Sequence, residues 1–413
     1  MCAALAAVVW ANSPWGETYT HLLHLEASVG VGDLQLSKSV SHWINDGVMG
    51  IFFFLVGLEI KREVIAGDLS SARKAALPAT AAVGGMVVPA LLYVAVNRGG
   101  PGMDGWGIPM ATDIAFALGM LALLGDRVPL SLKVFLTALA IVDDIGAVLV
   151  IAVFYTDTIV AFSLVAGLVL LAAGVIANRA GMRSSVAYFI LGTAVWLAFL
   201  KSGVHATIAG MLMAFTIPAR TRVGTPHLVA GMQANLERLT VVGAPADRQL
   251  NTNDEQHVID DMARCIERGT APLQRLEHAL VPVTAFFVLP LFALANAGVA
   301  VQGSLVDALR DPIALGIIVG LFLGKPIGIF VFAWLAVKLR LADLPAGVSW
   351  LPLLGTAMLG GVGFTMSLFI GGLAFADPAA LDTAKVGILA ASLLSGALGL
   401  ATLWWTLRKQ QTD

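Results

Sequence analysis

Apolar runs of about 20 residues recur along most of this chain, and that is the length a helix needs to cross the hydrocarbon of a bilayer. A soluble core does not repeat such runs. The composition agrees, because 58% of the 413 residues are hydrophobic and only 13% are charged, about half the charged fraction of an ordinary soluble domain. The sequence therefore predicts an all-α membrane protein with a single membrane domain covering residues 1–413.

We expect about twelve transmembrane helices. Residues 2–10 are apolar over about half the length of a span, and we expect them to be the end of a truncated first helix. A signal peptide would need a positively charged segment before this run, and none is present. The remaining spans are expected near residues 40–65, 75–96, 106–125, 131–155, 159–177, 184–200, 203–216, 278–301, 312–337, 349–375 and 382–406.

The basic residues predict the orientation of the chain. Lys and Arg accumulate on cytoplasmic loops, and most of the 25 in this sequence fall on the cytoplasmic side if the N-terminus lies there. About twelve spans also return the C-terminus to the cytoplasm. The net charge is −2 and the basic residues are scattered, so the sequence offers no basic patch of the kind that binds nucleic acid. Cys2 and Cys265 lie far apart, so neither a disulfide framework nor a metal site is expected.

Two segments outside the membrane have patterns of their own. Residues 25–36 alternate in polarity around Gly32-Asp33, which suggests a small external β-hairpin. Its edges are able to pair with a second subunit, and a plain ordered loop is the alternative.

The cytoplasmic loop of residues 217–277 contains Thr252 and Glu255 at capping-box spacing. A short amphipathic helix should follow, either as a regulatory or docking element or lying against the transporter. Its apolar face and stop signal would be Val258, Met262, Cys265, Ile266 and Gly269.

Ionisable residues inside a membrane are costly, about 3 kcal/mol each on insertion scales, and they mark candidate functional sites. By their depth in the expected spans these are Asp46, Glu59, Asp113, Asp143, Asp144 and Lys325.

Asp143 and Asp144 lie together in the middle of an apolar span. Neighbouring residues on a helix point about 100° apart, so one carboxylate can face a cavity while the other faces a neighbouring helix. Small hard cations prefer oxygen ligands, and a carboxylate that holds either Na⁺ or H⁺ is enough for antiport. The structural alternative is a polar clamp between buried helices.

Lys325 is the basic residue placed deepest in the membrane, within Gly324-Lys325-Pro326. It needs an acidic partner, since an isolated charge there is costly. We expect that partner to be Asp143, which leaves Asp144 for the cation.

Two spans are interrupted by helix-breaking sequence. The fourth contains Pro109 followed by Thr112-Asp113, and the eleventh contains a glycine-rich segment of residues 360–365. Paired interruptions in two halves of a transporter mark its ion site, and Asp113 would compensate the positive helix ends exposed there. For the eleventh span alone, a glycine-rich packing seam is the alternative.

Many short motifs, in order along the chain, resemble those of the NhaA-type sodium/proton antiporters. Together these motifs occur in essentially every expected span. They are Trp43–Asp46, Val56–Glu63, Ala111–Ala117, Ala140–Asp144, Lys201–Thr207, Arg275–His278, Leu291–Gly298, Gly324–Pro326 and Gly363–Ser367.

The resemblance implies inverted repeats, with the interrupted fourth and eleventh helices crossed beside a cytoplasmic funnel. Asp144 would be the principal ligand of Na⁺ and Asp143 would share the site and pair with Lys325, while Asp113 and Thr112 would lie at the crossing. It further implies electrogenic exchange of internal Na⁺ or Li⁺ for external H⁺ across the bacterial inner membrane, activation at alkaline pH, regulation of internal pH and sodium, no cofactor, and a homodimer formed through the 25–36 hairpin.

The family's pH-response cluster corresponds here to Glu59, Arg62, Glu63, Glu277 and His278. The first three share one helical face, and ordinary interfacial charges are the alternative. Asp46 and His205 belong to matching motifs, and a structural role for His205 is the alternative. The chain has Val281 where the family often has a second histidine, and its loop before Glu277 is longer, which puts the pH profile in doubt.

A proton-coupled transporter of another cation or of an organic solute on this fold is the main alternative. An intramembrane aspartyl protease would need signatures that are absent from the sequence, and there is no His-Glu-x-x-His zinc motif. We therefore do not expect an enzyme.

Overall fold

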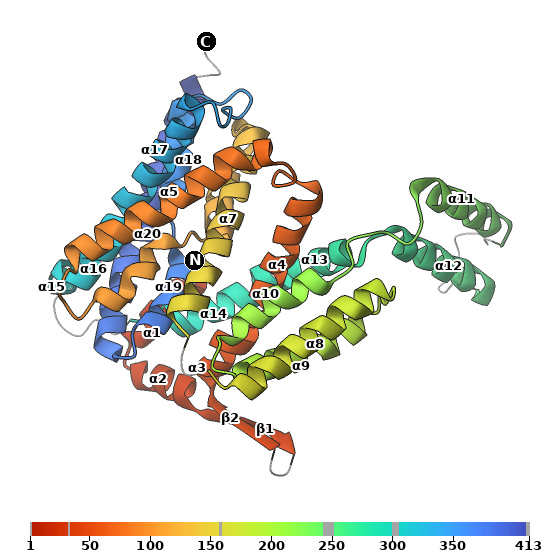
Figure 1. Cartoon of the computed structure of the whole chain (residues 1–413), viewed down its shortest axis with the longest axis horizontal. Coiled ribbons are helices and arrows are strands. Elements are labelled where there is room, and N and C mark those ends of the chain that lie inside the picture. The colour runs from red at the N-terminus through yellow and green to blue at the C-terminus, as the bar shows by residue number, and fades with distance from the viewer. Residues whose placement is uncertain (1, 32–33, 157–158, 243–251, 300–304, 410–413) are drawn as a thin grey trace.

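The computed structural model describes residues 2–31, 34–156, 159–242, 252–299 and 305–409, and this part of the chain is predominantly helical (Figure 1). Seven helical segments in it are long and apolar enough to cross a membrane. They are α5 (Ala72–Val96), η2 with α6 (Met103–Met110 and Ile114–Leu123), α7 (Leu130–Phe154), α8 (Ala161–Arg179), α13 with η4 and α14 (Pro272–Val283, Thr284–Val288 and Leu289–Asn296), α16 with η5 and α17 (Pro312–Ile318, Val319–Gly324 and Lys325–Lys338), and α20 (Pro378–Lys409).

An eighth span is broken. The helices α18 (Trp350–Leu359) and α19 (Phe364–Ala374) meet at an angle of 45°, where the sequence predicted an interrupted helix. The expected count of about twelve stays a prediction, because several segments are shorter or divided. They are α1 (Cys2–Ala11), the run α3, η1 and α4 (Val40–His42, Trp43–Val48 and Met49–Ala66), α9 (Ser185–Leu200) and α10 (Ala206–Thr216).

Three short helices were not predicted. They are α2 (Gly16–His24), η3 (Gly125–Arg127) and α15 (Leu305–Arg310).

Polar residues set the starts of several helices. The side chain of Ser71 accepts a hydrogen bond from Lys74 N before α5, Ser184 accepts from Ala187 N before α9, and Asp311 accepts from Ile313 N before α16. Each caps backbone N–H groups that have no partner within the helix.

Glycines allow close packing of the central helices. A Cβ atom at Gly328 of α17 would lie 2.6 Å from the carbonyl carbon of Gly84 in α5, and one at Gly57 of α4 would lie 2.7 Å from Ala214 of α10. Small residues let membrane helices approach in this way. The contact at Gly328 lies about one turn beyond Lys325, so it helps to fix the position of that lysine.

The outer helices present apolar side chains to their surroundings. Only 11% of the most apolar stretch of α8 is buried, and Phe162, Val169 and Ile176 of this helix are more than half exposed. These residues recur at seven-residue spacing and therefore share one face. A face of this kind is suited to contact with lipid.

The predicted hairpin is present as an antiparallel pair, β1 (Glu26–Val31) and β2 (Leu34–Ser39). It extends further than the predicted 25–36, because Ser37 continues the ladder and its hydroxyl accepts a hydrogen bond from Ser28 Oγ at 2.9 Å. The predicted turn at Gly32-Asp33 lies outside the described residues. Figure 1 shows the hairpin projecting from one end of the helical body.

The described part of the 217–277 segment contains α11 (Thr225–Val242), α12 (Asn253–Gly269) and the beginning of α13. At the start of α12 both halves of the capping box between Thr252 and Glu255 form. The sequence analysis did not predict α11. Figure 1 shows α11 and α12 projecting from the body, and α12 packs mainly against α11. The role of α12, as a regulatory or docking element or as a helix lying against the transporter, stays a prediction. An isolated amphipathic helix must bury its apolar face somewhere, and α11 provides that surface.

Candidate functional site

The two interrupted spans meet at their breaks. Residues 111–113 are non-helical between η2 and α6, as are residues 362–363 before α19. Asp113 N donates to Val362 O at 2.7 Å, and Thr112 Oγ1 lies 2.8 Å from Gly360 O. A Cβ atom at Gly363 would lie 3.1 Å from Ala111 O. The glycines therefore allow one broken backbone to lie directly against the other.

Asp113 caps the starts of two helices. Its Oδ1 accepts a hydrogen bond from Phe116 N of α6 at 3.1 Å, and its Oδ2 accepts from Thr365 N of α19 at 3.0 Å and from Thr365 Oγ1. The side chain is buried. Helix N-termini carry partial positive charge, which an anionic cap stabilises. Asp113 thus joins the two half-helices, and both of its oxygens are occupied.

Asp143 and Asp144 are both buried on α7, which faces these breaks. Asp143 Oδ2 accepts from Thr112 Oγ1 at 2.6 Å and forms an ion pair with Lys325 Nζ. A hydroxyl has one proton, so Thr112 donates either to Asp143 or to Gly360 O. Asp143 is therefore tied to the break in the fourth span and to α17 at once.

Each aspartate also has an oxygen without a partner. Within the described part of the chain, Asp143 Oδ1 and Asp144 Oδ1 are buried and accept no hydrogen bond. Such atoms are uncommon, because leaving a buried acceptor unsatisfied costs about 1–3 kcal/mol. Asp144 lies within the electrostatic influence of four charged groups, Asp143, Glu59, Asp113 and Lys325. This is an oxygen-rich position suited to a small cation or a proton.

Lys325 is completely buried at the start of α17, directly after the wide π-turn of η5. Its ammonium group donates to Met110 O, at the end of η2, as well as to Asp143. A carbonyl at a helix C-terminus carries partial negative charge. Lys325 therefore satisfies the end of one half-helix while Asp113 satisfies the starts of two others.

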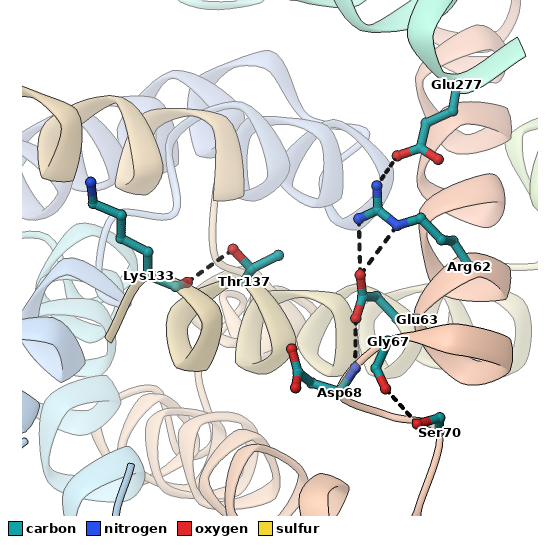
Figure 2. A network of polar contacts seen from close by, with 8 residues as sticks. All are labelled: Arg62, Glu63, Gly67, Asp68, Ser70, Lys133, Thr137 and Glu277. Carbon is teal, nitrogen blue, oxygen red and sulfur yellow. Dashed lines mark hydrogen bonds and ion pairs between the residues drawn. The ribbon is translucent and has the colours of Figure 1, made fainter. Parts of the chain in front are cut away.

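Four of the five residues of the expected pH-response cluster lie together on α4 and α13, and Figure 2 shows three of them, Arg62, Glu63 and Glu277. Arg62 donates to Glu63 Oε1 at 2.9 Å and pairs with Glu277, and Glu63 Oε2 accepts from Asp68 N at 2.9 Å. Glu59 interacts electrostatically with Glu277, Arg62 and Glu63.

His278 does not join this network. It is exposed, and its Nδ1 lies 2.7 Å from Gln274 O. Adjacent helical residues point about 100° apart. Because Glu277 points toward α4, the next residue, His278, points toward the surface.

Asp46 and His205 are brought together with a residue that sequence reasoning missed. Asp46 Oδ1 lies 3.5 Å from His205 Nε2, and Asp46 Oδ2 lies 2.8 Å from Nε2 of His42. The spacing of His42 and Asp46, four residues on a helix, is the signal that would have found it. Thr365 was also missed as a partner of Asp113, although it is the last residue of the predicted break at residues 360–365.

Comparison with known proteins decides the family. The sequence pattern of the family described as Na⁺/H⁺ antiporter 1 matches residues 1–403. The chain belongs to this family. Several curated members resemble it over nearly their whole lengths, and each is named Na(+)/H(+) antiporter NhaA.

The identity is 49% with the protein of Oleidesulfovibrio alaskensis, over 100% of this chain and 92% of that protein. It is 50% with the protein of Koribacter versatilis, over 97% and 86%, and 47% with that of Acidithiobacillus ferrooxidans, over 99% and 94%. Together with the apolar helices, membership of the antiporter family makes this a multi-span membrane protein.

The chemistry available at the aspartates is ion exchange. The described residues contain no group of three or more His, Cys, Asp or Glu side chains placed to hold a metal ion. Carboxylate oxygens and nearby backbone carbonyls are the ligands that hard cations prefer. In a member of this family, the same oxygens are available to a proton.

Proposed function

We propose that this protein is an electrogenic antiporter that exports Na⁺ or Li⁺ from the cytoplasm in exchange for external protons. The observation that carries the proposal is the pair of unpartnered oxygens, Asp143 Oδ1 and Asp144 Oδ1, buried beside two broken helices. Broken helices of this kind mark ion sites in transporters. The antiporter names of the relatives support the same function.

Asp144 is the residue that holds either cation or proton. Ionised, it offers oxygen to Na⁺, and protonated, it no longer attracts the cation. If only the occupied site changes sides, then a proton displaces sodium on one face and sodium displaces a proton on the other. The exchange needs no covalent step and no cofactor.

Asp143 connects the cation site with Lys325. Two opposite unit charges about 4 Å apart attract by roughly 4 kcal/mol at an effective dielectric of 20, which keeps the pair closed while the site is empty of cation. A Na⁺ between the unpartnered oxygens of Asp143 and Asp144 competes with Lys325 for Asp143. Cation binding therefore loosens the contact between α7 and α17.

The remaining features of the proposal follow from the family and the charge pattern. The protein acts in the bacterial inner membrane with both termini in the cytoplasm, regulates internal pH and sodium, and becomes active as the cytoplasm becomes alkaline. The cluster around Arg62, Glu63 and Glu277 supports a pH response, because the ion pair of Arg62 with Glu277 links α4 to α13. The β1–β2 hairpin offers unpaired edges for a homodimer.

Everted membrane vesicles that carry the protein provide the test. An imposed pH gradient should collapse when Na⁺ or Li⁺ is added, and Asp144→Asn should abolish the response because an amide does not exchange its charge. Asp126→Asn, at a loop between spans, is the matched control and should respond like the parent.

Absence of a cation response from neutral to moderately alkaline pH would refute the proposal. A response to K⁺ alone would assign another cation. A response to neither, but uptake of an organic solute with protons, would favour the alternative transporter.

A further inference from the structure

A second polar cluster lies near the hairpin, at the start of the second expected span. Asp46 on η1 is 8% exposed, and each of its carboxylate oxygens faces a different histidine. The side chain of His42 is 42% exposed, whereas the side chains of Asp46 and His205 are 11% and 13% exposed. The cluster thus runs from an accessible imidazole, through an enclosed carboxylate, to an enclosed imidazole.

The elements packed around Asp46 hold it without adding charge. Trp196 Nε1 of α9 donates to Asp46 O at 3.0 Å, which satisfies a carbonyl in the π-turn. The neighbouring Asn45 accepts from Asn296 of α14 at 2.8 Å. His42, on α3, and His205, at the start of α10, face the carboxylate. In the described part of the chain, the two histidines are the ionisable groups that form ion pairs with Asp46.

The inner end of the cluster approaches the broken eleventh span. The ring of His205 lies edge-on to Phe369 of α19, with centroids 5.3 Å apart. Phe369 comes five residues after Phe364, the first residue of α19, which corresponds to about 7.5 Å along the helix axis. His205 therefore stands about one and a half turns from the break where Thr365 binds Asp113.

We propose that His42, Asp46 and His205 form a proton relay that carries external protons toward the aspartate site. The inference rests on the proposed antiport, and it names the path by which its protons arrive. Protons would be collected at the outer imidazole, because histidine is the side chain that exchanges protons most readily near neutral pH.

Each transfer conserves the proton. His42 takes a proton from external water or buffer and, as an imidazolium, releases one from Nε2 to Asp46 Oδ2 at 2.8 Å. Rotation of the neutral carboxyl group turns its O–H toward His205, whose Nε2 lies 3.5 Å from Oδ1. His205 Nδ1 lies 2.9 Å from Thr207 Oγ1, and when Nδ1 donates to this hydroxyl, Nε2 is left to accept. Asp46 is then ionised again and ready for the next proton, while His205, now an imidazolium, passes its Nδ1 proton to the Thr207 hydroxyl, which releases its own proton inward.

Sodium efflux from right-side-out vesicles loaded with Na⁺ tests the relay, because proton uptake then occurs at the external face. With an alkaline, weakly buffered medium, His42→Gln should slow efflux by roughly a hundredfold, the low end of what a positioned proton carrier contributes. Added imidazole should restore the rate by delivering protons to Asp46 directly. Asp46→Asn should slow efflux in the same medium, and imidazole should not restore it.

The matched control is His24→Gln, which removes an exposed histidine of α2 whose Nδ1 contacts only its own helix at Thr20 O. It should behave like the parent. Exchange of radioactive sodium for sodium needs no proton and should be unchanged in His42→Gln.

A parental rate for His42→Gln in weak buffer would overturn the relay. So would a defect that imidazole does not relieve, or an equal loss of sodium–sodium exchange, since either would indicate a structural role. If the parent itself shows no exchange of sodium for protons, the proposed function fails, and that result is distinct from a failure of the relay alone.

Discussion

At the scale of single residues, the two adjacent aspartates of α7 differ in what holds them. Asp143 is bound by Thr112 and Lys325 through one oxygen. Asp144 instead interacts electrostatically with four charged groups, Asp143, Glu59, Asp113 and Lys325. The difference arises because neighbouring residues on a helix face different elements. Asp143 is therefore constrained by its contacts, and Asp144 is the residue that we propose for the cation or proton.

Lys325→Ala should destabilise the protein and impair transport. Removing one partner of a buried ion pair leaves the other charge buried alone, which costs about 3–5 kcal/mol, and here Met110 O loses its donor as well. The unfolding temperature in detergent and the cation response in vesicles both measure the effect.

Lys338→Ala serves as the control for this change. Lys338 is exposed at the end of the same helix, where its ammonium group lies over the ring of Trp334. Its removal should change the unfolding temperature far less. Unchanged stability and transport in Lys325→Ala would contradict the importance of the pair with Asp143.

At the scale of elements, α11 and α12 are held together by exposed charges as well as apolar contacts. Asp261 of α12 accepts from Arg264 at 2.7 Å and from Arg238 of α11 at 3.0 Å. These hydrogen bonds, first that from Arg264 and then that from Arg238, lower the pKa of Asp261. A lowered carboxyl pKa means that the contribution is present at neutral pH and is lost only as the pH falls through that lowered value.

Asp261→Asn should loosen the two helices at neutral pH. The thiol of Cys265 lies between them, 3.9 Å from Leu228 O, so its rate of alkylation reports the opening. In a Cys2→Ser background we expect the rate to rise by roughly two- to fivefold, in keeping with exposed ion pairs.

Asp260→Asn is the matched control, because Asp260 is exposed and accepts only from Gln256 within α12 at 3.1 Å. It should leave the alkylation rate near the parental value. An equal rise in both variants would show that the link between Arg238 and Asp261 does not hold the helices together.

At the scale of the whole molecule, two pieces project from the helical body, the β1–β2 hairpin and the α11–α12 pair (Figure 1). The two ends of each piece lie next to each other where the piece leaves the body. Val40 N donates to Leu25 O at 3.0 Å at the base of the hairpin, and Arg222 N donates to Arg268 O at 3.0 Å at the base of the helix pair. Either piece is therefore replaceable by a short linker.

Replacing residues 26–39 with a short Gly-Ser linker should convert a dimer into a monomer that still transports Na⁺. The reason is that a two-stranded sheet leaves backbone edges open for pairing with a second copy. Light scattering of the purified protein measures the mass, and vesicles measure transport.

Replacement of residues 225–269 is the control, and it should leave the dimer intact. A dimer that survives removal of the hairpin would contradict the proposed interface.

The class of the protein and much of its local structure were predictable from the sequence. The apolar runs predicted membrane helices, the proline and glycine clusters predicted the broken spans, and the spacing of Thr252 and Glu255 predicted a capping box that is present. These features are local, because each depends on residues that are close together in the sequence. The partner of Lys325 was predicted from the cost of an unpaired charge, and the structure places Asp143 beside it.

By itself, the sequence therefore determined that the chain lies in a membrane, which of its helices are interrupted and which ionisable residues are buried. The reason is that the length of apolar runs and helix-breaking residues act locally. Only the tertiary structure decided that Asp113 caps α6 and α19 together, that His278 turns away from Glu277, that α12 packs on α11, and that His42 reaches Asp46 beside His205. These contacts depend on which faces of distant helices meet, and helix packing settles that through side chains far apart in the chain.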